Sequence, residues 1–333
     1  MPKKKVLITG IAGQDGSYLA ESYLRDSWEV HGLIRRTSTL TRVRIDKISG
    51  WQNSEEANNF ILHYNDLNDF PSIFNVIKKV RPDVIIHLAA QSHVGISFEI
   101  PMETINVISN GTLSILEAIR QIDSNIIFYH ASTSEMFGGL FERKILTEES
   151  EFRPASPYAA SKLLAHNMTR IYRDAYGLKC YNGILFNHES PRRGENFVSR
   201  KITIAAASIY FGIQKKITLG NIESKRDWGH AKDYCEAIRL ISEKNVNKSD
   251  YIVASGEMHS VYEFAKKSFS RLNLDIDKYL EIDHNLKRPI EVESLMGSPI
   301  KIENELGWKK NYSFDELINE MVDEDFKLIE QNK

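Results

Sequence analysis

The chain has 333 residues, which is enough for one large domain or two modest ones around a substantial core. Its 43 Lys and Arg residues nearly balance 45 Asp and Glu residues, and the net charge of -2 excludes a general attraction to nucleic acid or to an anionic membrane. Any anion-binding site must therefore consist of a few basic side chains gathered locally.

The composition also bears on the compartment. Two cysteines, Cys180 and Cys235, are too few for a disulfide framework and fit a reducing environment. The apolar stretch after the basic N-terminus is too short for a signal-peptide core, and no apolar run reaches the roughly 20 residues of a membrane-spanning helix. We therefore expect a cytoplasmic protein with no membrane partner and no nucleic-acid partner.

Short apolar runs alternate with longer segments of helical period in the first half of the chain. The runs resemble buried parallel strands and lie at 6–9, 30–34, 60–63, 84–88, 126–130 and 181–185. The segments with apolar residues at helical spacing are 17–25, 70–80, 105–122 and 158–176. This alternation predicts an α/β fold, a Rossmann-type doubly wound parallel sheet.

The rhythm becomes less regular after about residue 186, where Arg, Asn and Gly are frequent. Helices are expected at 198–210, up to about 242 and at 314–329, with a strand at 251–254 and a polar stretch at 220–232. We predict two units that the chain crosses more than once. They are a dinucleotide-binding domain, 1–189 plus about 230–256, and a smaller mixed α/β substrate lobe, about 190–229 plus 257–333.

Three glycines, Gly10, Gly13 and Gly16, lie directly between the first predicted strand and the first predicted helix. Glycines here let the backbone turn tightly and approach a pyrophosphate, whose charge is met by amides at the helix N-terminus. The spacing is GxxGxxG, whereas the dehydrogenase fingerprint is GxGxxG. We expect a dinucleotide cofactor at this turn, beside Gln14 and Asp15.

The second predicted strand ends in Arg35 and Arg36, about 20 residues beyond the glycines. NAD enzymes usually place an acid here for the ribose 2′-hydroxyl, whereas an arginine accommodates a 2′-phosphate. The pair therefore favours NADP over a merely solvated basic pair. Asp66 and Leu67 follow the third strand and either border the adenine or form a plain turn, while the small residues 89–90 suit a backbone that passes close to the cofactor.

Tyr158 and Lys162 are four residues apart at the start of a predicted helix, so their side chains share one face. A free tyrosine has a pKa near 10 and is a poor base at neutral pH. A lysine ammonium and an oxidised nicotinamide beside it would each lower that pKa by roughly one to three units. The pair therefore predicts a base that takes a proton from a substrate hydroxyl while hydride leaves the same carbon.

A polar segment, Ser132-Thr133-Ser134-Glu135, follows the fifth predicted strand, at the end of the sheet where α/β folds bind ligands. Oxidation of an alcohol needs a hydroxyl near Tyr158, which Thr133 or Ser134 can supply. Once a ketone exists, Glu135 can remove a proton from the neighbouring carbon and deliver it to a departing hydroxyl, which eliminates water. A helix-capping or ion-paired Glu135 fits the residues equally well.

Seven segments together resemble the extended short-chain dehydrogenase/reductases and, among them, the GDP-mannose 4,6-dehydratase family. They are GQDGSYLAE (13–21), HGLIRR (31–36), AQSHV (90–94), ASTSE (131–135), SPYAASK (156–162), GILFNHESPRRG (183–194) and KRDWGHAKDY (225–234). The resemblance runs from about residue 5 to 325, and 183–194 is its most specific block. It implies a lyase that uses NADP, a GDP-sugar as substrate, no metal, and a homo-oligomer, either dimer or tetramer.

The resemblance also implies roles for individual residues. Thr133 would hydrogen-bond the sugar, Glu135 would act at C5 and C6, and Tyr158 with Lys162 would oxidise C4. The motifs and the resemblance together give as cofactor-binding residues Gly10, Gly13, Gln14, Asp15, Gly16, Arg35, Arg36, Asp66, Leu67, Leu88, Ala89, Ala90, Gln91, Ser92, Lys162, His188 and Arg193. The expected substrate-binding residues are Ser92, Asn187, Val198, Lys201, Arg226, Arg288 and Glu291.

The two arginines of the substrate set suit a diphosphate, because a guanidinium fork binds it bidentately; an interdomain salt bridge is the alternative. Three other functions stay open. A GDP-manno-heptose could be the substrate of the same reaction. A GDP-4-keto-sugar reductase or epimerase would need Tyr158 and Lys162 but no acid at Glu135, and a non-catalytic NADP-sensing regulator would need none of them.

Overall fold

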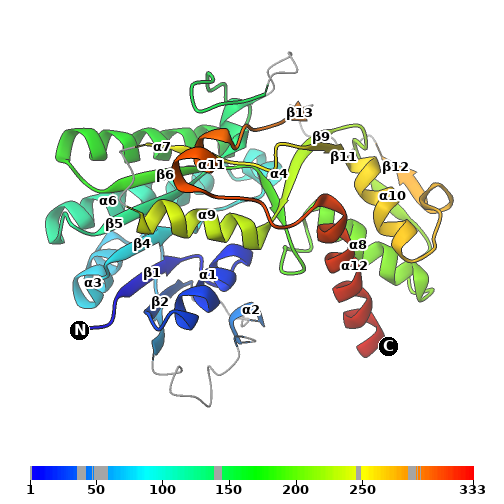
Figure 1. Ribbon diagram of the computed structural model, residues 1–333, viewed down its shortest axis with the longest axis horizontal. Coiled ribbons are helices and arrows are strands. Elements are labelled where there is room, and N and C mark those ends of the chain that lie inside the picture. Colours follow the sequence, from blue (N-terminus) through cyan, green and yellow to red (C-terminus); the bar gives the residue numbers. More distant parts are fainter. Residues whose placement is uncertain are drawn as a thin grey trace.

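The computed structural model describes residues 2–35, 43–46, 48, 59–138, 145–244, 249–283, 290, 292 and 294–333. Three of the predicted site residues, Arg36, Arg288 and Glu291, lie outside these ranges. Figure 1 shows the central sheet with its helices on the left and a smaller lobe, which carries α8, α10 and α12, on the right. No helix in the described part of the chain combines the length and the apolar character that crossing a membrane requires.

The central sheet has seven strands within the described residues, in the order β10-β6-β5-β4-β1-β2-β3, and every neighbouring pair is parallel. The strands are β1 (Lys5–Thr9), β2 (Glu29–Ile34), β3 (Phe60–Tyr64), β4 (Val84–His87), β5 (Ile127–Thr133), β6 (Cys180–Leu185) and β10 (Tyr251–Val253). The chain runs outward from β1 to β3, then returns to β4 and runs the other way. This reversal between β1 and β4 confirms the predicted doubly wound Rossmann-type fold and creates the crevice where such folds bind ligands.

Helices cover both faces of this sheet. One face packs against α1 (Gln14–Arg25), α9 (Ala231–Glu243) and α11 (Ile300–Leu306). The other packs against α3 (Phe70–Val80), α6 (Gly111–Ile122) and α7 (Pro157–Tyr176). Alternate residues of an inner strand such as β1, for example Ile8 and Leu7, enter the two cores, so such a strand is apolar on both faces and forms a continuous apolar run.

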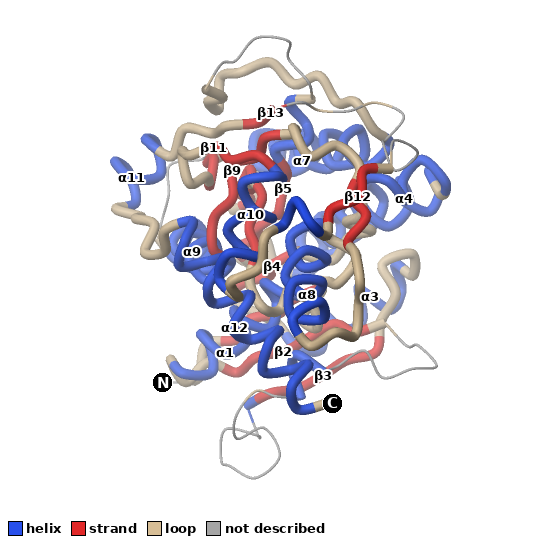
Figure 2. Tube along the Cα trace, turned by 90° about the vertical axis from the view of Figure 1, so that its right-hand side faces the viewer, coloured by secondary structure: helices blue, strands red, loops and turns tan. Residues whose placement is uncertain are grey.

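The smaller lobe combines short strands with three helices around a separate apolar core. Its strands are β7 (Asn187–Glu189), β9 (Lys225–His230), β11 (Met258–Ser260) and β13 (Ser294–Leu295) in one sheet, with β8 (Ile217–Leu219) and β12 (Leu280–Ile282) paired apart. Its helices are α8 (Val198–Tyr210), α10 (Val261–Arg271) and α12 (Phe314–Gln331). Figure 2 looks onto this lobe, with these three helices and β12 facing the viewer.

Shorter elements complete the chain. They are α2 (Val43–Asp46), α4 (Val94–Glu99), α5 (Pro101–Ile105), the π-helical turn η2 (Asn106–Asn110), and the 3-10 turns η3 (Ser134–Phe137) and η4 (Ile276–Lys278). The segment predicted as one helix at 105–122 is therefore a longer run that begins at α5 and continues through η2 into α6. The predicted helices at 70–80 and 198–210 agree with α3 and α8.

The predicted division into two domains stays a prediction. Cores in the sheet domain and in the smaller lobe agree with its general form. The last part of the chain is more mixed than the prediction assumed, because Ile302, Leu306 and Trp308 pack into the core of the central sheet. The segment around α11 therefore packs with the central sheet, although the predicted division assigned it to the smaller lobe.

Candidate active site

A cavity of about 660 Å³ opens at the carboxyl ends of β1, β4 and β5, between the central sheet and the smaller lobe. Eighteen of the predicted site residues line it: Gly10, Gly13, Gln14, Asp15, Gly16, Leu88, Ala89, Ala90, Ser92, Thr133, Glu135, Tyr158, Lys162, Asn187, His188, Arg193, Val198 and Arg226. The structure thus brings residues from across the sequence to one place. Whether each has its predicted role stays a prediction.

The glycine turn after β1 is closely packed. Gly10 has a φ of +71°, and a Cβ on it would lie 2.9 Å from the backbone nitrogen of Ala89, while one on Gly16 would lie 2.6 Å from Ile11 Cα. Gly13 begins α1, and no side chain of the described residues caps that end. The amides of the first turn therefore stay available to an anion, and the turn fits a dinucleotide pyrophosphate.

Thr9 explains why residues 88–90 follow this turn so closely. Its hydroxyl accepts hydrogen bonds from the backbone amides of Leu88 and Ala89, each at 3.1 Å, and it contacts His87 Nδ1 at 2.8 Å. The last residue of β1 therefore holds the chain leaving β4 against the glycine turn. The sequence analysis did not single out Thr9, because a buried threonine at a strand end carries no motif of its own.

Tyr158 and Lys162 lie on the first turns of α7. The helix begins after Ser156, whose side chain accepts a hydrogen bond from the Ala159 amide at 3.1 Å, and Pro157 occupies its first position. Lys162 Nζ donates to the backbone oxygen of Ala131 at 2.7 Å. This bond joins the helix to β5 directly behind the strand residues that reach the cavity.

The ionisation of the pair follows from its burial. Burial raises the pKa of Tyr158 to about 12; the Thr133 hydroxyl hydrogen-bonded to it and Arg193 act in the opposite direction, and Glu135 adds to the rise. Burial also lowers the pKa of Lys162 to about 8. The protein's own side chains therefore favour a neutral phenol, whereas the predicted phenolate needs a further positive charge beside it.

Thr133 and Glu135 stand where β5 ends and the η3 turn begins. Thr133 Oγ1 accepts a hydrogen bond from the Glu135 amide at 3.3 Å, which fixes the turn that carries the acid. Both residues line the same cavity as Tyr158, and Glu135 is close enough to affect the pKa of that tyrosine. A carboxylate and a phenol thus face one space, which can accommodate two different proton transfers.

Asp15 and His188 form an ion pair across the cavity. His188 Nε2 lies 2.9 Å from Asp15 Oδ2, and Gln14 Nε2 donates to the His188 backbone oxygen at 3.1 Å. Burial works against charge on both groups, but their mutual attraction outweighs it, raising the pKa of His188 and lowering that of Asp15. The pair therefore joins the glycine turn to β7 of the smaller lobe.

Arg226 reaches the cavity from β9, and its neighbour Asp227 holds that strand in place. The Asp227 carboxylate accepts bonds from the backbone amides of Ser255 at 2.7 Å, Gly256 at 3.0 Å and Gly297 at 3.3 Å. Burial nevertheless raises the pKa of Asp227 to about 6. Buried charged residues at this density explain why the polar stretch 220–232 gave no strand signal although it contains β9.

Five predicted site residues do not line this cavity: Arg35, Asp66, Leu67, Gln91 and Lys201. Arg35 is exposed at the end of β2, and Asp66 accepts a bond from the Asn68 amide at 2.9 Å, as in a plain turn. The Gln91 side chain folds back onto the His93 backbone, and Lys201 Nζ donates to the Thr218 backbone oxygen at 2.7 Å.

The cavity has lining residues beyond those of the predicted site. Arg44 on α2 lines the cavity and donates from Nε to the Arg192 backbone oxygen at 2.7 Å. Trp228 lines it too while belonging to the core of the smaller lobe. An arginine on a four-residue helix has no periodicity that could have identified it. No cluster of three or more metal-binding side chains occurs among the residues that the structure describes.

Sequence comparisons agree with this arrangement. The sequence model of the GDP-mannose 4,6 dehydratase family matches residues 7–321. The chain belongs to this family. GDP-mannose 4,6 dehydratase 2 of Arabidopsis thaliana is 48% identical over 100% of this chain and 89% of its own. GDP-mannose 4,6 dehydratase of Cricetulus griseus is 43% identical over 99% of this chain and 94% of its own.

Solved structures confirm the fold. The dTDP-glucose 4,6-dehydratase of Bacillus anthracis str. Ames in complex with NAD superposes with a TM-score of 0.84 at 22% identity, covering 98% of each chain. At that level of identity the likeness concerns the architecture alone. The Rossmann-type fold expected from the sequence is thereby matched by the backbone of a solved structure.

Proposed function

We propose that this chain is an NADP-dependent GDP-mannose 4,6-dehydratase, which converts GDP-mannose to GDP-4-keto-6-deoxymannose and water. The observation that carries the proposal is that Glu135 lines one cavity with Thr133, Tyr158 and the glycine turn. A reductase or epimerase of a 4-keto-sugar has no need of the acid, and a regulator has no need of any of these groups. Family membership supports the same reaction.

The cofactor is proposed to lie along the glycine turn, with its pyrophosphate at the uncapped N-terminus of α1. The preference for NADP rests on the basic end of β2. The residue that follows this strand is the exposed Arg35, whereas NAD enzymes usually have an acid there. Asp15 would repel a pyrophosphate if it stood alone, but the positive charge of His188, which is paired with it, offsets that repulsion. Arg193, which also lines the cavity, adds a cation nearby.

Oxidation at C4 is the first proposed step. An oxidised nicotinamide held in the cavity would supply an acceptor for the C4 hydride, its later return to C6, and a positive charge in the space that Tyr158 lines. The charge favours the phenolate, which burial alone disfavours, and Tyr158 then takes the proton from the C4 hydroxyl. Thr133 is hydrogen-bonded to Tyr158 and orients the C4 hydroxyl. Lys162 holds the backbone of β5, which carries Thr133, through its bond to the Ala131 oxygen.

Loss of water across C5 and C6 is the second step. The C4 ketone acidifies the C5 proton, which the Glu135 carboxylate removes. Glu135 then donates this proton to the C6 hydroxyl as the carbon–oxygen bond breaks, and water leaves. In the last step C6 receives the hydride and C5 receives a proton. The proton count closes because Tyr158 took one proton from the C4 hydroxyl in the first step.

The GDP moiety is proposed to lie toward the smaller lobe, where Arg226, Asn187 and Val198 line the cavity. A guanidinium there suits the diphosphate. Arg288 and Glu291 are retained as proposed partners from the family resemblance. We also propose a cytoplasmic location and a homo-oligomer; the free, buried state of Cys180 and Cys235 supports the reducing compartment.

The Glu135→Gln variant tests the proposal. It keeps the size of the side chain and removes the acid, so it should still bind NADP and GDP-mannose but lose dehydration by roughly 10²- to 10⁴-fold. Mass spectrometry detects the loss of one water, and cofactor release after denaturation measures NADP. Full dehydration by the variant would remove Glu135 from the mechanism, and a wild-type protein that dehydrates GDP-manno-heptose faster than GDP-mannose would change the substrate.

A further inference from the structure

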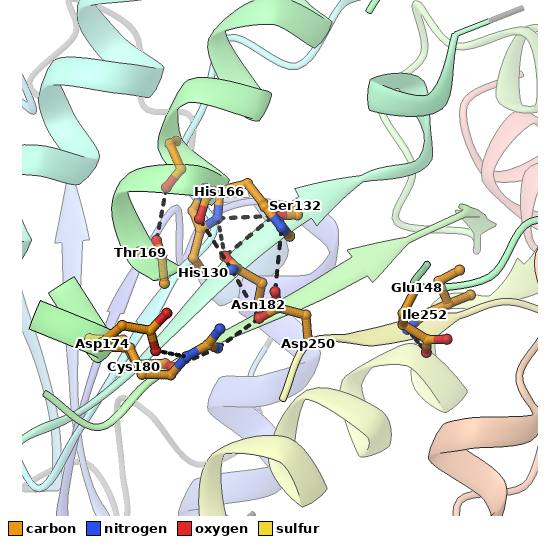
Figure 3. Close-up of polar contacts among 12 residues, drawn as sticks. His130, Ser132, Glu148, His166, Thr169, Asp174, Cys180, Asn182, Asp250 and Ile252 are labelled. Atoms are coloured by element: carbon orange, nitrogen blue, oxygen red, sulfur yellow. Dashed lines mark hydrogen bonds and ion pairs between the residues drawn. The ribbon is translucent and has the colours of Figure 1, made fainter. Parts of the chain in front are cut away.

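A contiguous group of buried polar side chains lies behind the catalytic strand, on the α7 side of β5. It consists of His130 and Ser132 from β5, His166 and Arg173 from α7, Asn182 from β6, and Asp250 beside β10 (Figure 3). Five of the six are at most 5% exposed, and Asp250 has a side chain that is 16% exposed. Ser132 also lines the cavity, but none of the six is a catalytic candidate.

Ser132 lies at the centre of this network. Its Oγ is 3.0 Å from His166 Nδ1 and 3.1 Å from His130 Nδ1. On the far side, His166 Nε2 lies 3.4 Å from Asp250 Oδ2, and the Asp250 carboxylate also accepts a bond from Arg173 at 2.8 Å. A chain of contacts thus leads from β5 in the interior of the sheet through α7 to Asp250, which directly precedes the edge strand β10.

The Asp250 carboxylate favours one arrangement of the hydrogen atoms around His166. Burial holds the pKa of both His166 and His130 below the usual value, so each ring carries one proton at neutral pH. With the ring proton of His166 on Nε2, which faces the Asp250 carboxylate at 3.4 Å, Nδ1 accepts, and the Ser132 hydroxyl donates to it. Asn182 then donates to Asp250 at 3.1 Å and accepts from His130 Nδ1 at 3.0 Å.

The position of the network relates it to the active site. Ser132 separates Ala131, whose backbone oxygen receives Lys162 Nζ, from Thr133, which is hydrogen-bonded to Tyr158. His166 follows Lys162 by one helical turn on the same helix. The hydrogen bond from Ser132 to His166 therefore joins the two backbones that carry the reacting groups.

Such a network is an expensive way to join a helix to a sheet. Apolar side chains of similar volume usually stabilise as much or more, because buried polar groups must be completely satisfied. Directional hydrogen bonds fix the position of α7 along its axis relative to β5, whereas apolar contacts would allow the helix to slide. A displacement of about 1 Å at a catalytic group can lower turnover by about 10²-fold, so this position matters for the reaction.

We propose that His166 and Asp250 are positioning residues, which act through Ser132 to hold β5 and α7 in the register that places Thr133 against Tyr158 and Lys162. The proposal rests on the proposed function for its kinetic consequence. Its structural content concerns the spacing of the two backbones and holds for any substrate of the cavity. Asp250 orients the His166 ring, and the ring fixes the Ser132 hydroxyl.

Three variants and a matched control test this proposal. His166→Phe keeps a ring and removes both nitrogen atoms, Ser132→Ala removes the hydroxyl, and His166→Asn retains an acceptor close to the position of Nδ1. The control is Thr203→Val on α8, which removes a buried hydrogen bond of 2.6 Å to Asp325 in the smaller lobe. Thr203 is as completely buried as the network and lines no part of the cavity.

The expected result is a selective loss of kcat. His166→Phe and Ser132→Ala should lower kcat for GDP-mannose by about tenfold or more with KM and NADP content nearly unchanged, and His166→Asn should recover part of the loss. Thr203→Val should lower Tm by about as much as His166→Phe and Ser132→Ala do, but it should leave kcat unchanged. Two results would overturn the proposal. One is an equal kcat in wild type and His166→Phe. The other is a Thr203→Val variant that loses kcat to the same extent as His166→Phe.

A second readout does not depend on the substrate. The titration of Tyr158 is followed by ultraviolet difference absorbance in protein loaded with oxidised cofactor, after subtraction of the Tyr158→Phe protein. Loss of register weakens the bond from Thr133, so the pKa of Tyr158 should rise in His166→Phe and not in Thr203→Val. An unchanged Tyr158 titration in His166→Phe would refute the positioning role, whatever the activity of the wild type. A wild type that is inactive on GDP-mannose would instead refute the proposed function.

Discussion

The two walls of the cavity are built in different ways. The wall from the central sheet consists of residues at the ends of parallel strands and at the start of α1 and α7, elements with strong periodic patterns. The opposite wall comes from β7, β9 and the start of α8, where short strands are held by buried polar bonds such as those of Asp227. Chemistry is concentrated on the first wall, and recognition of the nucleotide is proposed for the second.

This difference predicts that substitutions on the first wall affect kcat and those on the second affect KM. The largest expected effect belongs to Tyr158→Phe, which removes the proton acceptor for C4 oxidation and keeps the ring. Turnover should fall by roughly 10²- to 10⁴-fold while KM for GDP-mannose changes little. Steady-state kinetics with GDP-mannose measure both constants, and a variant that keeps full kcat would show that the first step needs no phenol.

Gly16→Ala tests how closely the glycine turn is packed. The added Cβ would lie 2.6 Å from Ile11 Cα, so the turn must shift, with an expected cost of about 1–3 kcal/mol in the free energy of unfolding and weaker NADP binding. Gly177→Ala is the control, because that position has a φ of +68° but no atom within 4 Å of the new Cβ. It should cost about 1 kcal/mol and leave NADP affinity intact. Equal NADP affinity in both variants would contradict the role of the turn.

Arg226→Lys probes the second wall. A lysine keeps the charge but loses the fork, so KM for GDP-mannose should rise by about tenfold, with kcat almost unchanged. Arg271→Lys is a control in the same lobe, since Arg271 forms an exposed ion pair with Asp323 and does not line the cavity. A rise in KM for both variants, or for neither, would contradict a specific role of Arg226 in substrate binding.

The smallest expected effect is the pH dependence of the pair that joins the two walls. The raised pKa of His188 means that its contribution to stability is complete below about pH 6.5 and is lost as pH rises through its folded-state pKa. The lowered pKa of Asp15 means that its contribution is present above about pH 3.9 and is lost as pH falls through its folded-state pKa. The Tm difference between wild type and His188→Asn should therefore be largest between about pH 4 and 6.5; a difference that grew toward alkaline pH would contradict the ion pair.

The same division separates what the sequence predicted from what it did not. The central strands, α3, the glycine turn and the Tyr158–Lys162 spacing follow from local periodicity, and the structure agrees with them. β9 was missed because its buried residues include the charged Arg226 and Asp227, and Asp227 is stabilised by bonds to segments 28 and 70 residues away. Arg44 was missed for a similar reason, since its place at the cavity depends on a contact with Arg192 far along the chain.

The sequence also could not show the network behind β5. His130, His166 and Asn182 are separated by 16 to 52 residues, and each alone reads as an isolated polar residue in an apolar element. Only the register between β5 and β6, which pairs His130 with Asn182, brings them together. Long-range polar contacts of this kind are set by the assembled sheet and leave no pattern in a single segment.

The central claim is that one hydride leaves C4 and returns to C6 of the same sugar while water is lost. Incubation of the purified protein with GDP-mannose carrying deuterium at C4, followed by mass spectrometry and NMR of the product, tests it directly. The account predicts a product lighter by one water, with the deuterium in the C6 methyl group. A product that retains all its oxygen atoms, or one whose deuterium has gone to the solvent, would contradict it.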